Sequence, residues 1–197
     1  PSAKLDFELE VGFFTGSGSA MGHAIPVDRA EASMAGIVLV NDWSARDLQA
    51  WEYRPLGPLL GKSFATTISP WVVTLDALAP YRVDAPRQEP APLPHLAATP
   101  NRGIDLRLEV ELNGNIVSRT NFRHMYWTMA QQLAHMSSNG TRIRTGDLYA
   151  SGTVSGPGKD GAGSLLERTR NGTRPISLDD GTSRTFLEDG DTVVLRK

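Results

Sequence analysis

The sequence contains no cysteine among its 197 residues. Disulfide bonds, thiolate metal sites and a cysteine nucleophile are therefore excluded, and the absence is typical of a reducing compartment, so we expect a cytoplasmic protein. No apolar run approaches the roughly 20 residues that a transmembrane helix needs. The 20 basic residues nearly balance the 22 acidic ones. We therefore expect neither a nucleic acid nor a membrane as a partner.

Short β-strands joined by turns dominate the pattern of the sequence. Side chains alternate between apolar and polar over Leu5–Phe14 and Ile104–Leu112, and Asn113-Gly114 is a strong hairpin signal. Residues Ser69–Leu78 also have the composition of a strand. No internal repeat or linker divides the chain, so residues 1–197 are predicted to form a single domain. The predicted fold class is β-rich α+β, with a mixed sheet rolled into a sandwich or barrel.

Two helices interrupt the predicted strands. Ser44 followed by Asp47 resembles a capping box, which would open a short helix after Asp42. A longer helix is predicted near residues 121–138, because methionine and leucine side chains recur there at helical spacing. These methionines are expected to pack in the core.

Two glutamates lie two residues apart on the first predicted strand. Glu8 and Glu10 would project from one face roughly 6–7 Å apart, and Asp42, after a buried run, could add a third carboxylate. Such oxygen ligands suit Ca²⁺ or Mg²⁺. The alternative is a solvated strand face, which the spacing alone favours because carboxylates are mostly exposed. Glu109 and Glu111 repeat the spacing on a polar hairpin, and for them we expect solvation.

Polar side chains also lie along one stripe of the short helix. Arg46, Gln49 and Tyr53 are three and four residues apart, so they share a face. A cation, an amide and a phenol together suit the recognition of carboxylate and carbonyl oxygens, although an ordinary amphipathic surface helix has the same spacing. Lys62 could stabilise enolate charge beside a metal or could be a solvated surface lysine. Thr66 could contribute a hydroxyl.

A glycine-rich loop separates two further candidates. Thr153 precedes this loop, and Glu167 follows it where a strand could present the carboxylate to a cleft. Neither residue is a strong candidate by itself. The four histidines show no metal-ligand spacing with one another or with an acid, so we expect them to be structural.

Several strings closely resemble the fumarylacetoacetase (fumarylacetoacetate hydrolase) family. They include Asp6-Phe-Glu-Leu-Glu10, Asn41-Asp-Trp-Ser-Ala-Arg-Asp47 and, as the most specific stretch, Trp51–Phe64. Further strings at 67–73, 121–129, 146–153 and 186–191 extend the likeness over nearly the whole chain. The resemblance implies the fold of that family's C-terminal catalytic domain, and the chain is expected to lack the N-terminal part and the last strands.

The resemblance also implies roles for the candidate residues. It implies that Glu8, Glu10 and Asp42 bind Ca²⁺ and/or Mg²⁺, with Lys62 and Thr66 also near the metal. The substrate and catalytic residues that it implies are those that polarise oxygens (Arg46, Gln49 and Lys62), those that contact substrate (Tyr53 and Thr153) and the glutamate that orients a catalytic histidine (Glu167). No histidine of this chain matches that catalytic position, nor is a fourth metal ligand, an aspartate, present. Arg168 and Arg170 also replace the hydrophobic residue and the tryptophan that the family usually has beside that glutamate.

The activity implied is metal-dependent hydrolysis of a carbon–carbon bond in a ketonic substrate. Fumarylacetoacetate would give fumarate and acetoacetate, the last step of tyrosine and phenylalanine catabolism. A homodimer is implied as well, for which the sequence itself offers only the apolar side of the helix near residues 121–138. The alternatives are another acylpyruvate or β-diketo acid hydrolase, an isomerase or a decarboxylase of the same superfamily, or a non-catalytic metal- or ligand-binding fragment.

Overall fold

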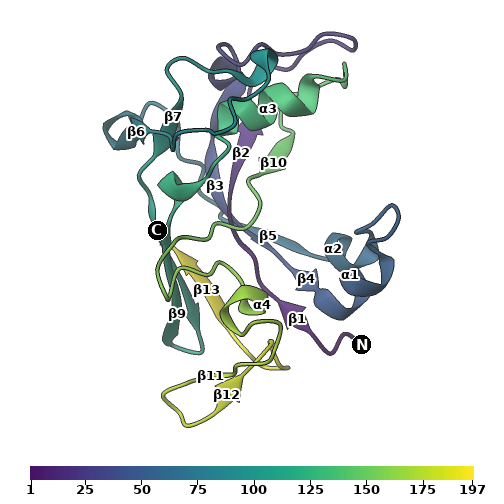
Figure 1. Cartoon of the computed structure of the whole chain (residues 1–197), viewed down its shortest axis with the longest axis vertical. Helices are drawn as coiled ribbons and strands as arrows, with labels where there is room; N and C mark the ends of the chain where they lie inside the picture. Colours follow the sequence, from purple (N-terminus) through teal and green to yellow (C-terminus); the bar gives the residue numbers. More distant parts are fainter.

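The computed structural model describes residues 1–197, and antiparallel pairing joins every pair of neighbouring strands. The largest sheet has four strands in the order β10-β2-β3-β5. Its members are β2 (Leu9–Thr15), β3 (Met34–Asp42), β5 (Thr66–Ile68) and β10 (Leu148–Ala150). The long β2–β3 ladder forms the centre of the molecule (Figure 1). The β-rich fold is as the sequence predicts.

A second sheet of three strands has the order β13-β8-β9. It consists of β8 (Arg107–Leu112), β9 (Asn115–Asn121) and β13 (Val193–Arg196). Asn113 and Gly114 turn the β8–β9 hairpin with positive φ angles of 50° and 82°, which is the conformation that this dipeptide favours. Three two-stranded ladders complete the sheets: β1 (Leu5–Asp6) with β4 (Ser44–Ala45), β6 (Arg82–Asp84) with β7 (Arg102–Ile104), and β11 (Ile176–Ser177) with β12 (Ser183–Arg184).

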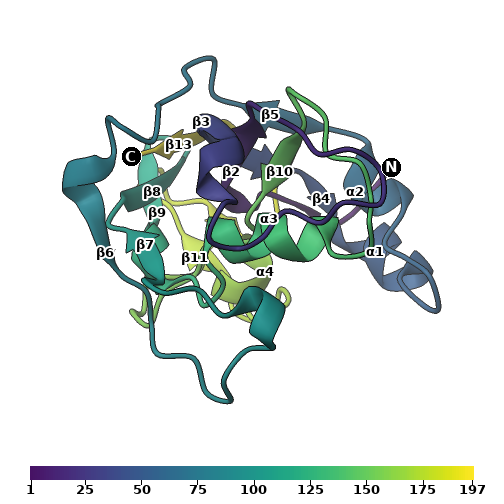
Figure 2. The same cartoon turned by 90° about the horizontal axis from the view of Figure 1, so that it is seen from above.

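The helices are short. They are α1 (Arg46–Glu52), α2 (Leu60–Ser63), α3 (Met129–Ser137) and α4 (Leu165–Arg168), together with four 3₁₀ turns at Glu31–Ser33, Ala79–Tyr81, Pro94–Leu96 and Phe122–His124. Two views place α1 and α2 on the opposite side of the molecule from β6 and β7 (Figures 1 and 2). None of these helices is long and apolar enough to cross a membrane.

The predicted long helix is shorter than expected. It begins at Met129, because the Thr128 side chain accepts a hydrogen bond from the Gln131 amide and Gln131 bonds back, forming a capping box. Upstream, the Asn121 side chain accepts from the Arg123 amide and closes a separate 3₁₀ turn. The two caps therefore divide the predicted helix.

Two other local predictions were wrong. Ser44 lies in β4 and its hydroxyl donates to the Asp42 carbonyl, so α1 starts at Arg46 without a side-chain cap. Residues 69–78 are irregular and end in a turn at 75–78 instead of forming a strand, and an isolated bridge joins Val73 to Ile37.

The hydrophobic core is one cluster of 24 buried residues to which both sheets contribute. Phe7, Leu9 and Val11 are at most 1% exposed, as their alternation predicts. The opposite, acidic side of the same strand is also buried, with Glu8 only 8% and Glu10 only 2% exposed. This face is therefore not a solvated strand surface. Because burying carboxylates is costly unless their charges are compensated, the two glutamates need partners.

Candidate metal centre

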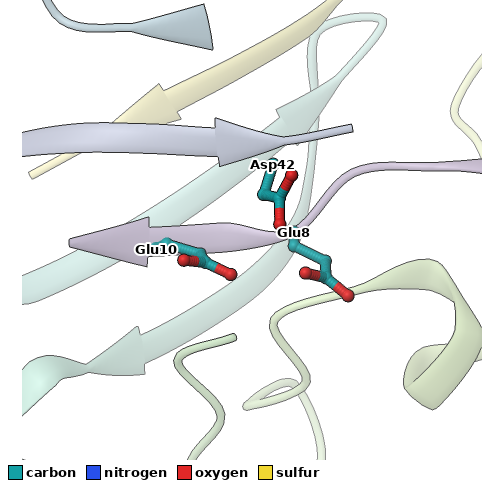
Figure 3. A group of neighbouring side chains, drawn as sticks. All are labelled: Glu8, Glu10 and Asp42. Atoms are coloured by element: carbon teal, nitrogen blue, oxygen red, sulfur yellow. The ribbon is translucent and has the colours of Figure 1, made fainter. Parts of the chain in front are cut away.

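Three carboxylates converge at the β2–β3 ladder. Glu8 immediately precedes β2, Glu10 lies within it, and Asp42 is the last residue of β3. The antiparallel register pairs Leu9 with Asn41, and the Asp42 amide donates to the Glu8 carbonyl at 3.2 Å. One oxygen from each of the three carboxylates lies within 4.8 Å of the others. Figure 3 shows Asp42 reaching from β3 toward the segment that carries Glu8 and Glu10.

Two basic side chains neutralise part of this charge. Nζ of Lys62 lies 2.5 Å from Oε2 of Glu8 and 2.5 Å from Oδ2 of Asp42. Nη1 of Arg46 lies 2.7 Å from Oε1 of Glu8. Glu8 thus has two cationic partners and Asp42 has one.

Glu10 has no cationic partner. Its carboxylate accepts one hydrogen bond, from the Gly152 amide at 3.0 Å. Burial, reinforced by the charges of Glu8 and Asp42, raises the pKa of Glu10 to about 7. Burial acts in the same direction on Glu8, but the Lys62 hydrogen bond and the charges of Arg46 and Lys62 outweigh it and lower the pKa of Glu8.

The charge balance of the cluster fits a divalent cation. A fourth carboxylate, Asp6, is fully buried beside Arg46. When all are ionised, four carboxylates face the two cations Arg46 and Lys62, which leaves two negative charges. The three candidate ligands offer only carboxylate oxygens, the donors that Ca²⁺ and Mg²⁺ prefer. The residues present therefore suit such a cation.

The α1 stripe is only partly assembled at this centre. Nη1 of Arg46 donates to Oε1 of Gln49 at 3.1 Å, and its Nη2 makes no hydrogen bond within the chain. Tyr53 ends α1 and is 43% exposed, with the Arg54 guanidinium 5.0 Å from its ring centre. The structure therefore joins Arg46, Gln49 and, through Glu8, Lys62. Tyr53 meets this group only through its backbone amide, which donates to the Gln49 carbonyl at 3.0 Å.

The remaining candidates lie around the carboxylates. Thr66 of β5 pairs with Asp42 in the ladder and is exposed. Thr153 directly follows Gly152, whose amide bonds Glu10. Glu167 lies on the single turn of α4, not on a strand as expected, and its Oε2 accepts from the Ser155 hydroxyl at 2.5 Å. No histidine joins the three-carboxylate group.

Three supporting residues were missed in the sequence. Asp6 accepts from Nε of Arg46 at 2.9 Å, and the Ser44 hydroxyl accepts from Nζ of Lys62 at 2.8 Å. Glu52 accepts from the Leu59 and Gly61 amides and so holds the loop before Lys62. Asp6 could have been found, because it shares the alternation of Glu8 and Glu10. Nothing in the sequence distinguishes Ser44 or Glu52.

A cavity of about 810 Å³ lies between α3 and β10 and extends to Gly152, next to the acidic centre. Met125 and Met136 line this cavity, and Met136 is 48% exposed. The expectation that every methionine of this segment packs in the core was therefore wrong for Met136. A wide apolar cavity next to a charged centre is a common arrangement of ligand-binding sites.

Together, the rolled antiparallel fold and the buried carboxylate cluster define a β-rich protein with a site suited to a divalent cation. Its sequence matches the family model described as fumarylacetoacetate (FAA) hydrolase C-terminal over residues 1–196. The chain belongs to the fumarylacetoacetate hydrolase family.

Curated relatives agree with this assignment. The chain is 54% identical to a fumarylacetoacetase of Arabidopsis thaliana over 98% of its length, and 52% identical to that of Homo sapiens over 97%. In both comparisons it covers 47% of the relative, so the chain spans about half the length of the curated relatives it matches.

Solved structures share the fold. A putative HpcE protein from Mycobacterium smegmatis is 26% identical with a TM-score of 0.63, covering 100% of this chain and 56% of that one. A fumarylacetoacetate hydrolase from Exiguobacterium antarcticum is 21% identical with a TM-score of 0.64, covering 99% and 53%. A fumarylpyruvate hydrolase from Pseudomonas aeruginosa, solved with Mn²⁺ and pyruvate, is 19% identical with a TM-score of 0.63, covering 99% and 62%. The last two likenesses concern the fold alone.

Proposed function

We propose that this protein is a metal-dependent hydrolase that cleaves the carbon–carbon bond of fumarylacetoacetate to give fumarate and acetoacetate. The observation that carries the proposal is the cluster of buried Glu8 and Glu10 with half-buried Asp42, to which Lys62 and Arg46 are bonded. Identity of 54% over nearly the whole chain to a fumarylacetoacetase supports the same substrate.

Glu8, Glu10 and Asp42 would hold Ca²⁺ or Mg²⁺, with Lys62 and Thr66 beside it. When bound, such a cation supplies positive charge that polarises a ketone oxygen and favours the enolate that bond cleavage produces. The proposal therefore needs Glu10 ionised. Its pKa of about 7 means that a large share of the cation-free protein carries a proton on this residue at neutral pH.

Arg46, Gln49 and Lys62 would bind and orient substrate oxygens. Arg46 is only 8% exposed, and its free Nη2 can donate to a substrate carboxylate or carbonyl oxygen. Nζ of Lys62 is already bonded to Glu8, Asp42 and the Ser44 hydroxyl, so it would act through its positive charge, which suits an oxygen that becomes an enolate. Hydrogen bonds within the chain thus hold both cationic groups in place.

Glu167 would orient the base that activates water. Ser155 fixes one of its carboxylate oxygens, and the Ser164 hydroxyl accepts from the Glu167 amide at 3.3 Å, which ties the turn in place. We assign no general base within these 197 residues. Tyr53 and Thr153 are proposed as further substrate contacts, and the homodimer and the cytoplasmic location stay predictions.

The test is the loss of diketone absorbance of fumarylacetoacetate, measured for this chain and for the longest natural form of the protein. Each form is assayed with Ca²⁺, Mg²⁺ or a chelator. We expect metal-dependent turnover in at least the longest form. No turnover in either form would refute the proposed activity, and acylpyruvates assayed in parallel would then identify a sister reaction. A cation that binds without turnover of any substrate would indicate a non-catalytic module.

A further inference from the structure

Asp6 is a fully buried carboxylate whose hydrogen bonds join two separate parts of the candidate site. It lies on β1, and its side chain is 0% exposed. Oδ2 accepts from Nε of Arg46 at 2.9 Å, and the same oxygen accepts from the Leu166 amide at 2.9 Å. Oδ1 accepts from the Leu165 amide at 2.8 Å. One carboxylate thus bonds both α1 and α4.

On the α1 side, the bond from Nε fixes the orientation of the guanidinium. A planar guanidinium held at Nε by Asp6 and at Nη1 by Glu8 and Gln49 has little rotational freedom left. The direction of Nη2 is then set by these bonds within the protein, before any substrate binds. Asp6 therefore determines where the substrate-binding donor of Arg46 lies.

On the α4 side, Asp6 anchors the turn that carries Glu167. The first amides of a helix have no partner within the helix, and Asp6 accepts from those of Leu165 and Leu166. A single turn of four residues has little stability of its own, so these two bonds fix its place next to β1 (Figure 1). Together with the Ser155 and Ser164 bonds, they fix the position of Glu167.

We propose that Asp6 is a positioning residue that holds Arg46 and the Glu167 turn in one fixed arrangement. The proposal rests on the proposed function, because it assigns Arg46 to substrate binding and Glu167 to orientation of the base. Residues that orient a site's direct ligands commonly change activity about 10- to 100-fold when they are replaced. Asp6 itself would not touch the substrate.

Asp191 offers a matched control for a purely structural role. Its side chain is 4% exposed and accepts from Nε of Arg184 at 2.9 Å, from the Glu188 amide at 2.8 Å and from Nδ2 of Asn113 at 2.7 Å. It is thus a buried carboxylate with an arginine and a backbone amide, like Asp6. None of these partners is a candidate site residue.

The experiment compares Asp6→Asn with Asp191→Asn in the longest natural form of the protein, saturated with Mg²⁺. We expect Asp6→Asn to lower kcat/KM for fumarylacetoacetate roughly 30-fold, and Asp191→Asn to leave it within twofold after a similar loss in Tm. A double-mutant cycle adds Arg46→Lys. In that background Asp6→Asn should cost less than threefold, because the group that it positions is already changed.

A kcat/KM within twofold of wild type for Asp6→Asn would overturn the proposal. Equal losses for Asp6→Asn and Asp191→Asn, or additive effects in the cycle, would do the same. If Asp6→Asn does not fold, nitrogen-15 NMR of the wild type decides: the Arg46 Nε–H should exchange at least 100-fold more slowly than that of Arg87, whose side chain is 86% exposed. Equal exchange rates would contradict the positioning.

The same NMR measurement separates the two proposals. If the wild type does not hydrolyse fumarylacetoacetate, the proposed function fails. The positioning is then judged by whether Asp6→Asn accelerates the exchange of Arg46 Nε–H and of the Leu165 and Leu166 amides together. Acceleration of all three supports it, and acceleration of none overturns it.

Discussion

Glu8 and Glu10 have the same spacing as Glu109 and Glu111, but the two pairs lie in different surroundings. On β8, each glutamate has its own arginine: Nε of Arg119 lies 2.8 Å from Glu109, and Nη2 of Arg196 lies 2.7 Å from Glu111. Both glutamates are partly exposed. Around β2, the carboxylates outnumber the cations, and Glu8 and Glu10 are buried while Asp42 is half-buried. The spacing of two acids alone therefore does not favour a cation, whereas an excess of negative charge that is largely shielded from water does.

The two glutamate pairs differ in which elements of the fold carry their basic partners. Arg119 and Arg196 lie on the strands that flank β8. The ladders place both arginines opposite Glu109, and Arg196 reaches Glu111 along the diagonal. Arg46 and Lys62 come from α1 and α2 instead, and each is shared between two carboxylates. Because both basic side chains are bonded to the other carboxylates, Glu10 has no basic partner.

The largest expected effect is on cation affinity. Glu10→Gln should weaken Ca²⁺ or Mg²⁺ binding about 100-fold or more, because charge count and oxygen ligands determine such affinities. Glu111→Gln should change it less than twofold. Titration calorimetry of both variants measures the difference, and equal affinities would refute the contrast between the two glutamate pairs.

Removal of a basic side chain that two carboxylates share should destabilise the chain when no metal ion is bound. Lys62→Met leaves Glu8 and Asp42 without the ammonium, so we expect the free energy of unfolding to fall by about 3 kcal/mol. Arg119→Met, which removes a partner whose side chain is 62% exposed, should cost at most about 1 kcal/mol. Urea denaturation compares the two variants, and a smaller loss for Lys62→Met would contradict the shared-charge arrangement.

The pH dependence of stability should reflect the raised pKa of Glu10. Its pKa rises from 4.5 to about 7 on folding, so the folded state holds the proton more tightly. The stabilisation is full below pH 4.5 and is lost as the pH rises through 7, on the order of 1–3 kcal/mol. Unfolding of the cation-free chain between pH 5 and 8 should show this loss for wild type and not for Glu10→Gln. The same slope in both would exclude Glu10 as its source.

The smallest effect is expected at the second glutamate pair. A double-mutant cycle of Glu111 and Arg196 should give a coupling energy of about 0.2–1 kcal/mol, which added salt reduces. Thermal unfolding at two salt concentrations measures it. A coupling as large as that between Glu8 and Lys62 would remove the contrast between the two regions.

The sequence predicts the local features of the fold better than the distant contacts. The Asn113-Gly114 turn and the alternation along β2 depend on neighbouring residues, and both agree with the structure. The start of α3 was misplaced because the helical spacing of the methionines continues upstream of the capping box of Thr128 and Gln131, where the helix begins. The role of Ser44 depends on Lys62, 18 residues away, and no local pattern signals it.

The candidate site, too, could be predicted from the sequence only in part. The spacing of Glu8 and Glu10 and the position of Asp42 suggested a cation site but favoured a solvated face, and only the family resemblance reversed that preference. Their convergence depends on the register between β2 and β3. The contribution of Asp6 depends on α4, and the hydrogen bonds that join them span almost 160 residues of chain. Such contacts follow from the complete fold and not from any one segment.

The most direct test of the cation site is the anomalous diffraction of a crystal of this chain soaked in Mn²⁺, which stands in for Ca²⁺ or Mg²⁺. We expect one strong peak within coordination distance of Glu8, Glu10 and Asp42, and none beside Glu109 and Glu111. A peak at the second pair alone, or no peak among Glu8, Glu10 and Asp42 at saturating Mn²⁺, would contradict the assignment of a metal centre to this protein.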